Sequence, residues 1–387
     1  MKLLDADDAF LAIDTLHKAG DVCARLGRSR EALEHFGEML KLAWRLDLPG
    51  KAGAAHGRIG RIHRALGDYP LSLQHLDMAH LLFDLAADRP GVAASLDDIG
   101  RVNYLVGKSE EALRCHKTAL SIRTEIKDER GMALTLSWIG LVEAQMGELG
   151  MAQRSFEQSL SISQATRDPA RIIFSLLDLG SLAHEAGHPE LARNLLEQAR
   201  GLSRHMGEPL HECHLALQIG AAWLSQERFE EAEIELLKAK EIARKFSARR
   251  LLAEADLGLA ECELRAGNRI HARHHARQAV DAAEKMGAIP LMGAALRILA
   301  QSLAGGEEGM DRVEARESFE QSISLLAGCH AAMELSRTFA AYAAFEDALG
   351  REEPAEHLRD RSIGIRRRAG IEGMKKASTG SPIDAQA

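Results

Sequence analysis

Apolar and small residues recur along the chain at a fixed interval, and this interval defines the predicted elements. The clearest marker is a large aliphatic residue followed by glycine, as at Ile99-Gly100 and Ile139-Gly140. The small residue of this pair returns every 40 positions, at Gly20, Gly60, Gly100, Gly140, Gly180, Gly220, Ala260 and Ala300. A register kept over this length indicates an internal repeat rather than a chance pattern.

Each period is predicted to hold two helices joined by a tight turn. A second glycine lies seven residues after the first, where a residue past the helix end can adopt the left-handed conformation. It stands at Gly27, Gly67, Gly107, Gly147, Gly187 and Gly267, with Glu227 in its place once. Prolines occur just after this turn or between periods, and both positions suit the first turn of a helix. Because the register does not depend on the prolines, they support it independently.

The pattern predicts an all-α fold, a right-handed α-solenoid of about nine helix-turn-helix units. Glycine or alanine at a helix crossing lets the two backbones approach closely. One hairpin cannot bury its apolar face alone, so neighbouring units are expected to stack into a single superhelix over residues 1–370. The units are expected near residues 5–47, 48–88, 89–128, 129–168, 169–208, 209–248, 249–288, 289–328 and 329–370. Residues 371–387 lack apolar periodicity, which predicts a disordered tail.

The repeat resembles the tetratricopeptide repeat (TPR). The signature of that family appears here as Trp138-Ile139-Gly140, followed by Ala152, Phe156 and Ser159. The period departs from the usual TPR length of about 34 residues. Arrays with the longer period are similar to those of kinesin light chain, GoLoco-binding scaffolds, bacterial Rap-type regulators and the sensor arms of bacterial ATPase activators. The resemblance covers about residues 5–370.

Composition narrows the class of protein further. Aromatic residues make up only 4% of the chain, too few for the core of a typical β-sandwich or barrel. The five cysteines form no CxxC pair, which is typical of a reducing compartment. No apolar run approaches the roughly 18 residues of a membrane span. The N-terminal segment is too acidic and too interrupted in its apolar residues for a signal peptide. The net charge of −8 argues against general nucleic-acid binding. These features favour a cytoplasmic protein without a membrane span.

The sequence offers little chemistry for catalysis. Gly107-Lys108-Ser109 resembles the end of a phosphate-binding loop, but Val102 stands where that loop needs glycine. We therefore expect no enzyme activity and no cofactor. His271 and His275 share one helical face, and His211 lies near Cys213 and His214. Metal binding at either cluster is left open, although solvated helix faces account for both more simply.

In the TPR family the first helix of each unit lines the concave groove. The resemblance implies that three positions face inward: three residues before the small residue, one after it and four after it. Arginine side chains at these positions could bind a carboxylate in bidentate fashion. Alternatively, the arginines pair with Asp97 and Asp98 or only solvate the wall. The candidate partner-binding residues are Arg61, Arg64, Asp97, Arg101, Tyr104, Leu141, Leu177, His184 and Leu217.

Two functions fit these observations. The first is a non-catalytic interaction scaffold or adaptor that binds a peptide or protein segment, acidic if the arginines bind it, in the concave groove. The second is a peptide- or small-ligand-responsive TPR regulator acting in trans. Rap-type regulators are expected to carry an N-terminal module before their repeats, and the first repeat here begins too early to leave room for one. A basic run at Arg361, Arg366, Arg367, Arg368, Lys375 and Lys376 is a weaker candidate surface. The sequence does not define the oligomeric state.

Overall fold

The computed structural model describes residues 6–203, 209–305 and 309–370, and every regular element in these ranges is an α-helix. Consecutive helices pack as hairpins, so the predicted all-α solenoid is confirmed. The helices are α1 (Ala6–Arg25), α2 (Ser29–Arg45), α3 (Pro49–Ala65), α4 (Tyr69–Leu85), α5 (Arg89–Leu105), α6 (Ser109–Glu125), α7 (Glu129–Gln145), α8 (Leu149–Ala165), α9 (Pro169–Glu185), α10 (Pro189–Ser203), α11 (Pro209–Ser225), α12 (Phe229–Lys245), α13 (Arg249–Arg265), α14 (Arg269–Met286), α15 (Ile289–Leu303), α16 (Gly309–Gly328), α17 (Ala332–Ala348) and α18 (Glu352–Arg368).

The turns between helices follow from local backbone chemistry. Gly67 and Gly147 end the first helices of their units with φ values of 77° and 83°, as the repeat predicts. Glu227 keeps this left-handed conformation without being glycine, with φ at 59°. At the start of the first helices α5 and α7, the side chains of Asp88 and Asp128 accept hydrogen bonds from the backbone N–H three residues on. Aspartate caps and glycine turns therefore set the limits of several helices.

Each small residue of the repeat lies where its helix crosses the second helix of the same hairpin. A Cβ on Gly140 would lie 2.5 Å from the ring of Phe156, and one on Gly60 would lie 2.8 Å from Leu76. At such distances any added side chain would displace its neighbour, so glycine allows the close crossing of the two helices. Where Ala260 replaces glycine, the buried residue sixteen positions on is the small Ala276.

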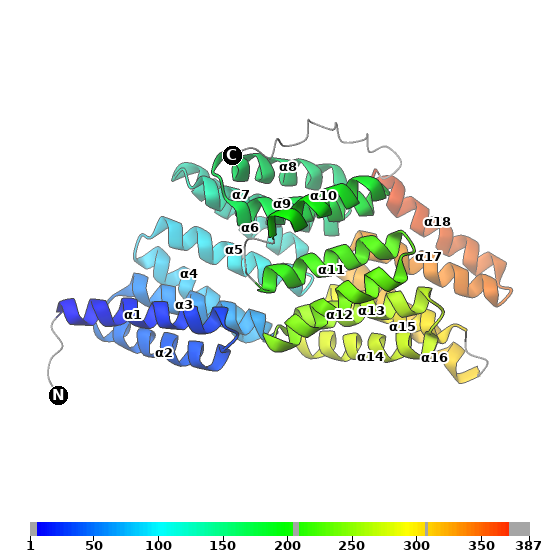
Figure 1. Ribbon diagram of the computed structural model, residues 1–387, viewed down its shortest axis with the longest axis horizontal. Coiled ribbons are helices and arrows are strands. Elements are labelled where there is room, and N and C mark those ends of the chain that lie inside the picture. The colour runs from blue at the N-terminus through cyan, green and yellow to red at the C-terminus, as the bar shows by residue number, and fades with distance from the viewer. Residues whose placement is uncertain (1–5, 204–208, 306–308, 371–387) are drawn as a thin grey trace.

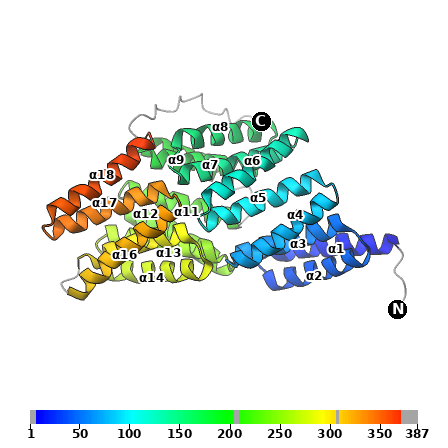
Figure 2. The same ribbon diagram turned by 180° about the vertical axis from the view of Figure 1, so that it is seen from behind.

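The array curves with its first helices on the inside. Each first helix contacts the next one, from α1 and α3 through to α15 and α17, whereas contacts between successive second helices are weaker or absent in the described part. Elements on the inside of a curve lie closer together, so α3, α5, α7, α9, α11 and α13 form the concave inner wall. Figures 1 and 2 show α7–α10 arranged along one side of the molecule and α11–α16 along the other.

The superhelix turns tightly enough for its second turn to contact its first. A Cβ on Gly67, in the α3–α4 turn, would lie 2.6 Å from Met286 of α14. Ser109 Oγ of α6 donates a hydrogen bond of 3.2 Å to the carbonyl of Cys329, 220 residues later in sequence. Arg337 of α17 pairs with Glu185 of α9. We refer to these packed positions as the inter-turn contact.

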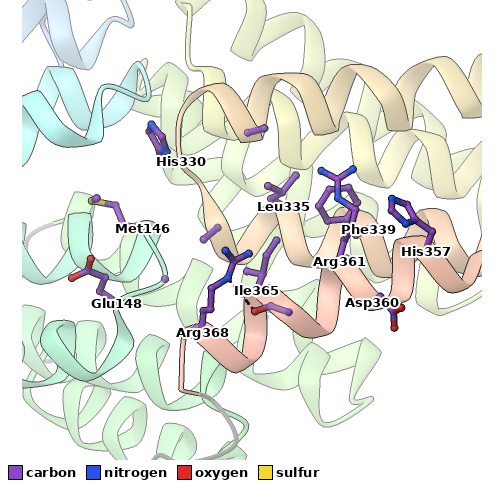
Figure 3. Close-up of a pocket in the computed structure, with 15 residues that line it drawn as sticks. Met146, Glu148, His330, Leu335, Phe339, His357, Asp360, Arg361, Ile365 and Arg368 are labelled. Carbon is purple, nitrogen blue, oxygen red and sulfur yellow. Dashed lines mark hydrogen bonds between the residues drawn. The ribbon is translucent and has the colours of Figure 1, made fainter.

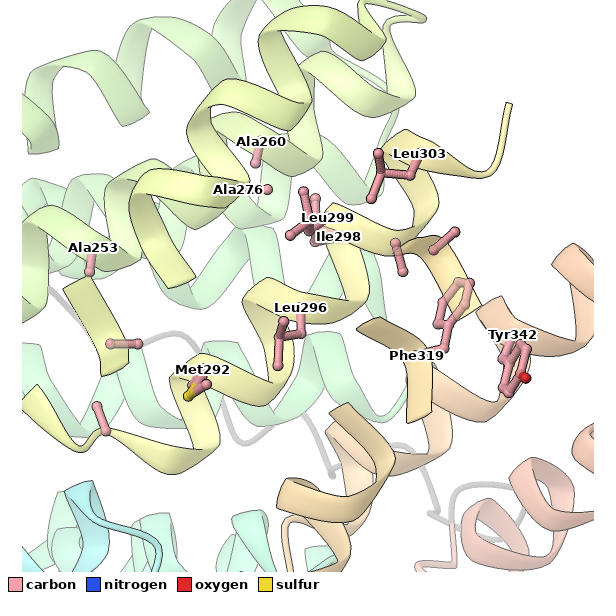
Figure 4. Close-up of a cluster of buried hydrophobic side chains, with 14 of the residues drawn as sticks. Ala253, Ala260, Ala276, Met292, Leu296, Ile298, Leu299, Leu303, Phe319 and Tyr342 are labelled. Atoms are coloured by element: carbon pink, nitrogen blue, oxygen red, sulfur yellow. The ribbon is translucent and has the colours of Figure 1, made fainter. Parts of the chain in front are cut away.

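The largest apolar cluster spans the inter-turn contact. Tyr69 and Leu76 of α4 belong to the same cluster of buried side chains as Ala253 of α13 and Met286 of α14. Figure 4 shows the part of this cluster that extends from α13 towards α17. Burial of apolar surface therefore holds the two superhelical turns together.

The described residues contain no helix that is both long and apolar enough to span a bilayer. The predicted tail at residues 371–387 lies outside the described residues, as does the predicted start of the first unit at residue 5. The division of the chain into a single superhelix and a tail stays a prediction.

Candidate functional site

Pairs of side chains connect neighbouring first helices along the inner wall. In each pair, the residue one position after the small residue contacts the residue two positions before the next small residue. Hydrogen-bond geometry gives these pairs a defined arrangement. Three such inner-wall pairs are Arg58–Asp21 (3.1 Å), Arg61–Asp98 (2.5 Å) and Ser181–Gln218 (2.5 Å).

Arg101 extends this arrangement from α5 to α7. Its guanidinium lies 4.9 Å from the centre of the Trp138 ring, and its Nη1 lies 3.4 Å from Asp98 Oδ1. Burial disfavours ionisation of Asp98, but the charges of Arg61, Arg101 and Arg64 outweigh it and lower the pKa of Asp98 to about 2. The alternative that these arginines pair with an aspartate is therefore confirmed for Asp98.

Arg64 and Tyr104 lie one helical turn further along α3 and α5. Both are half-buried, and Tyr104 contacts the edge of the Trp138 ring with 6.0 Å between ring centres. Arg64 makes no ion pair within 4 Å among the described residues. Burial, with the charge of Arg101, lowers the pKa of Arg64 to about 10, so the side chain remains positive at neutral pH.

The prediction that Asp97 faces the groove is wrong. Asp97 is 1% exposed and lies between helices α5, α6 and α7. Its carboxylate contacts His116 Nδ1 at 2.9 Å, Arg123 Nη2 at 2.7 Å and Thr135 Oγ1 at 2.9 Å. A partner in the groove cannot reach this buried network. The inward position on the first helix is the next residue, two before the small one.

The same one-residue displacement affects the apolar candidates. Leu177 is 4% exposed and packs with Ile173 and Leu215 in the core, so it does not offer a surface to a ligand. Leu141 and Leu217 are half-buried and pack against core clusters with one side. His184 is half-buried on α9, and burial lowers its pKa. The proposed apolar part of the wall is therefore smaller than the sequence suggested.

Asp178 is an inner-wall residue that the sequence reasoning did not select. It stands two positions before Gly180, where Leu141 of the preceding unit offers no polar atom to complete an inner-wall pair. Burial raises the pKa of Asp178 to about 7, against the charge of Arg171 and a hydrogen bond from Ser137. The inner-wall spacing itself is the signal that would have identified it.

A second group of missed residues comes from the far side of the superhelix. Arg250 of α13 pairs with Glu254 at 2.5 Å, one helical turn away. The charge of Arg250 contributes to the pKa shifts of Arg64, Tyr69 and Tyr104. Nothing in the local sequence of α13 relates it to α3, because only the superhelical turn brings the two helices near each other.

A separate cavity of about 750 Å³ lies at the C-terminal end of the inter-turn contact. It is lined by the α7–α8 turn on one side and by α17 and α18 on the other, as Figure 3 shows. Arg361 lies 4.1 Å from the centre of the Phe339 ring, and Arg368 is also at the wall. Part of the predicted basic run therefore borders this cavity, while Lys375 and Lys376 lie outside the described residues.

The structure shows where one of the two histidine clusters and the phosphate-loop fragment lie. His271 has a side chain that is 72% exposed, whereas His275 contacts Asp256 at 3.1 Å. Across residues 6–203, 209–305 and 309–370 no group of three or more His, Cys, Asp or Glu side chains is placed to hold a metal ion. The fragment ending at Ser109 is a turn between two helices that packs on Cys329, without the strand that precedes a phosphate loop.

Comparison with known proteins finds a repeat model that matches part of the chain and solved structures of similar fold. Residues 51–125 and 131–204 match the tetratricopeptide repeat model. A Rap protein complexed with competence and sporulation factor has a TM-score of 0.70 at 15% identity, covering 95% of this chain and 99% of that chain. The Rap conjugation gene regulator of plasmid pLS20 in complex with the Phr* peptide gives 0.61 at 12% identity, with coverage of 95% and 99%. Aspartyl phosphate phosphatase F from Bacillus subtilis has a TM-score of 0.53 at 12% identity, covering 98% of this chain and 99% of that chain.

These coverages correct one expectation from the sequence. The described helices match nearly the full length of the Rap chains, so no separate module of those chains is left outside the match. The supposed lack of room for an N-terminal module therefore does not distinguish this chain from Rap-type proteins. At identities this low, the likeness concerns the fold alone.

Proposed function

Residues 51–125 and 131–204 of this chain match the tetratricopeptide repeat model, and from this premise we propose that the protein is a non-catalytic interaction protein that binds a peptide segment along the inner wall of its superhelix. The proposal rests on the inner-wall pairs, which set polar groups at regular intervals along consecutive first helices. An extended peptide presents its own polar groups at regular intervals, so such a wall suits it better than it suits a compact small molecule.

The candidate contacts are the inner-wall residues that water still reaches. Arg61 keeps a side-chain exposure of 38%, and Tyr104 and His184 are half-buried. Arg64, Arg101, Leu141 and Leu217 complete this set, whereas Asp97 and Leu177 are excluded by their burial. Two of the similar solved structures are of proteins complexed with a factor or peptide, which supports the same class of ligand.

A second candidate function is a regulator whose shape responds to its ligand. The inter-turn contact favours this function, because residues of the first and second superhelical turns meet beside the inner wall. A ligand that contacts both turns would bind one spacing of the turns better than another, and it would shift their equilibrium accordingly. This candidate shares the ligand site of the first and adds a conformational response.

Selection from a displayed library of random heptapeptides tests the proposed function. We expect wild-type protein to enrich peptides, and Ala221→Trp to bind them at least tenfold more weakly, because the indole would fill the inner wall one position after Gly220. Gln198→Trp is the matched control, since Gln198 is exposed on the second helix α10. Affinities would be measured by fluorescence anisotropy with synthetic copies of the enriched peptides.

Two results would contradict the proposal. One is that no peptide is enriched, and the other is that Ala221→Trp binds as tightly as Gln198→Trp. Circular dichroism and thermal unfolding of both variants establish that the introduced tryptophan leaves the helical array folded.

A further inference from the structure

We propose that the cavity between the α7–α8 turn and α18 is a second ligand site, which binds a small molecule with an apolar body and one oxyanion, either a carboxylate or a phosphate. Arg361 and Arg368 would bind the oxyanion. Met146, Leu335 and Ile365 would contact the apolar body. The site is separate from the inner wall and adds a ligand beyond the peptide of the proposed function.

The size and the lining of the cavity suit such a molecule. Its volume of about 750 Å³ lies within the range of about 300–1,000 Å³ that is typical of small-molecule sites. Met146 at the end of α7, Leu335 of α17 and Ile365 of α18 are half-buried, so each keeps apolar surface that a ligand can cover. Removing this surface from water would favour the binding of an apolar body.

The two walls of the cavity belong to different superhelical turns. A Cβ on Gly147, in the α7–α8 turn, would lie 3.0 Å from the Cβ of Ala332 at the start of α17. It would lie 3.8 Å from the Cβ of Ala369, which follows α18. Because these three residues all line the cavity, its walls meet there. A molecule in the cavity would therefore contact both turns.

One face of α18 supplies the cationic part of the site. Arg361 and Arg368 are seven residues apart and share this face, with Gly364 between them. No atom lies within 4 Å of a Cβ placed on Gly364, so the space between the two arginines is open. A ligand can therefore approach both side chains from the same side.

Both arginines keep N–H groups that no acidic side chain uses. The Arg361 guanidinium lies over the Phe339 ring, 4.1 Å from the ring centre, and Arg368 Nε donates a hydrogen bond of 3.2 Å to the carbonyl of Gly364. Neither arginine has an acidic partner within 4 Å in the part of the chain that the structure describes. A guanidinium has five N–H groups, so these contacts leave donors for an oxyanion.

The acidic residues of the wall leave these charges unpaired. Glu148 belongs to the opposite wall, in the α7–α8 turn. Figure 3 shows the Asp360 carboxylate on the other side of α18 from the guanidinium of Arg361. An oxyanion between Arg361 and Arg368 would form charge-assisted hydrogen bonds, because a planar guanidinium can present two parallel N–H groups to it.

A ligand bound in this way would connect the two superhelical turns. Its oxyanion would contact α18, and its apolar body would reach Met146 on the opposite wall. Such a ligand binds the packed turns better than separated ones and shifts their equilibrium towards the packed form. The cavity thus gives the second candidate function a physical basis that does not require a peptide.

Equilibrium dialysis with radiolabelled octanoate tests the site. We expect wild type to bind octanoate, and Arg361→Met to bind it about tenfold more weakly, because methionine removes the charge. Gly364→Leu should abolish binding, since its side chain would fill the open space between the arginines. Arg367→Met is the matched control and should bind as wild type, because Arg367 is an exposed arginine of α18 that does not line the cavity.

Thermal unfolding with four probes separates the two parts of the ligand. A molecule that binds the folded state raises the midpoint of unfolding. Octanoate and octyl phosphate carry both parts, 1-octanol lacks the charge, and acetate lacks the apolar chain. At equal ionic strength we expect octanoate or octyl phosphate to raise the midpoint of wild type more than 1-octanol and acetate do. The anion that gives the larger rise identifies the group as a carboxylate or a phosphate.

Three results would overturn the proposed cavity site. The first is that wild type binds neither octanoate nor octyl phosphate. The second is that Gly364→Leu binds octanoate as tightly as Arg367→Met, with circular dichroism showing that both are folded. The third is that 1-octanol raises the midpoint as much as the two anions, or that Arg361→Met responds as wild type, because the arginines would then not recognise the ligand. Peptide binding by the inner wall is independent of all three.

Discussion

At the scale of single residues, the neighbours of an inner-wall aspartate decide its pKa. Asp98 is surrounded by arginines and has a pKa of about 2, whereas Asp178 lacks an equivalent partner and has a pKa raised by burial to about 7. Both residues occupy the same repeat position, two before a glycine. The preceding unit decides the difference, since it supplies Arg61 to one and Leu141 to the other.

Replacing Asp178 by Asn should change how stability depends on pH. The carboxyl has a higher pKa in the folded than in the unfolded protein, so wild type loses stability as the pH rises from about 4 to about 7. Above this window the ionised carboxylate is buried at a cost that asparagine avoids. We expect Asp178→Asn to be more stable than wild type by about 2 kcal/mol at pH 8 and equal to it near pH 4.

Urea denaturation at a series of pH values measures this difference. Asp84→Asn serves as the control because Asp84 is an exposed carboxyl of α4, and its pH profile should match that of wild type. An Asp178→Asn profile parallel to wild type between pH 4 and 8 would mean that Asp178 titrates normally.

At the scale of elements, each hairpin depends on a small residue, usually glycine, at the point where its two helices cross. Glycine at the crossing brings the first helix against a large residue sixteen positions later, as with Gly140 and Phe156. The sequence predicted this crossing correctly, because a small residue repeated at a constant interval indicates a close approach of two backbones in every unit. It also predicted the turns, since glycine and proline act through the local backbone alone.

Adding one methyl group at the crossing should therefore weaken the fold. We expect Gly140→Ala to lower the free energy of unfolding by about 1–3 kcal/mol, because its Cβ would lie 2.5 Å from the Phe156 ring. Gly150→Ala is the matched control on α8, where no atom lies within 4 Å of the added Cβ. Alanine favours a helix by up to about 1 kcal/mol over glycine, so the control should be more stable than wild type.

Urea denaturation measures the change in the free energy of unfolding of each variant, from the shift of its midpoint at an unchanged slope of free energy against urea concentration. If Gly140→Ala were as stable as Gly150→Ala, the close crossing of α7 and α8 would be wrong.

At the scale of the whole molecule, the second superhelical turn contacts the first and shapes the candidate site. The α7–α8 turn lies close to the start of α17, where a Cβ on Gly147 would be 3.0 Å from that of Ala332. Ion pairing of Arg337 with Glu185 links the same two regions. The curvature of the array therefore depends on contacts between units that are far apart in sequence, and not only on the stacking of neighbours.

A large side chain at this contact should open the superhelix. We expect Ala332→Trp to increase the radius of gyration measured by small-angle X-ray scattering and to destabilise the protein by about 1–3 kcal/mol through overpacking. Ala340→Trp on the same helix is the control, because Ala340 is exposed and its indole would extend into solvent. Equal radii for the two variants would show that the inter-turn contact does not determine the curvature.

The sequence alone determined the hairpins, their turns and their number, because each of these depends on contacts within about 40 residues that repeat with a fixed register. It also directed attention to Arg61, Arg64, Arg101 and Tyr104 on the inner wall. It misplaced Asp97 and Leu177 because helix periodicity allows either of two adjacent residues to follow the same face, and packing against the second helix decides between them. Only the tertiary structure brought Met286 against Gly67 and Arg337 against Glu185, since the pitch of a superhelix is the sum of small rotations between units that no local pattern records.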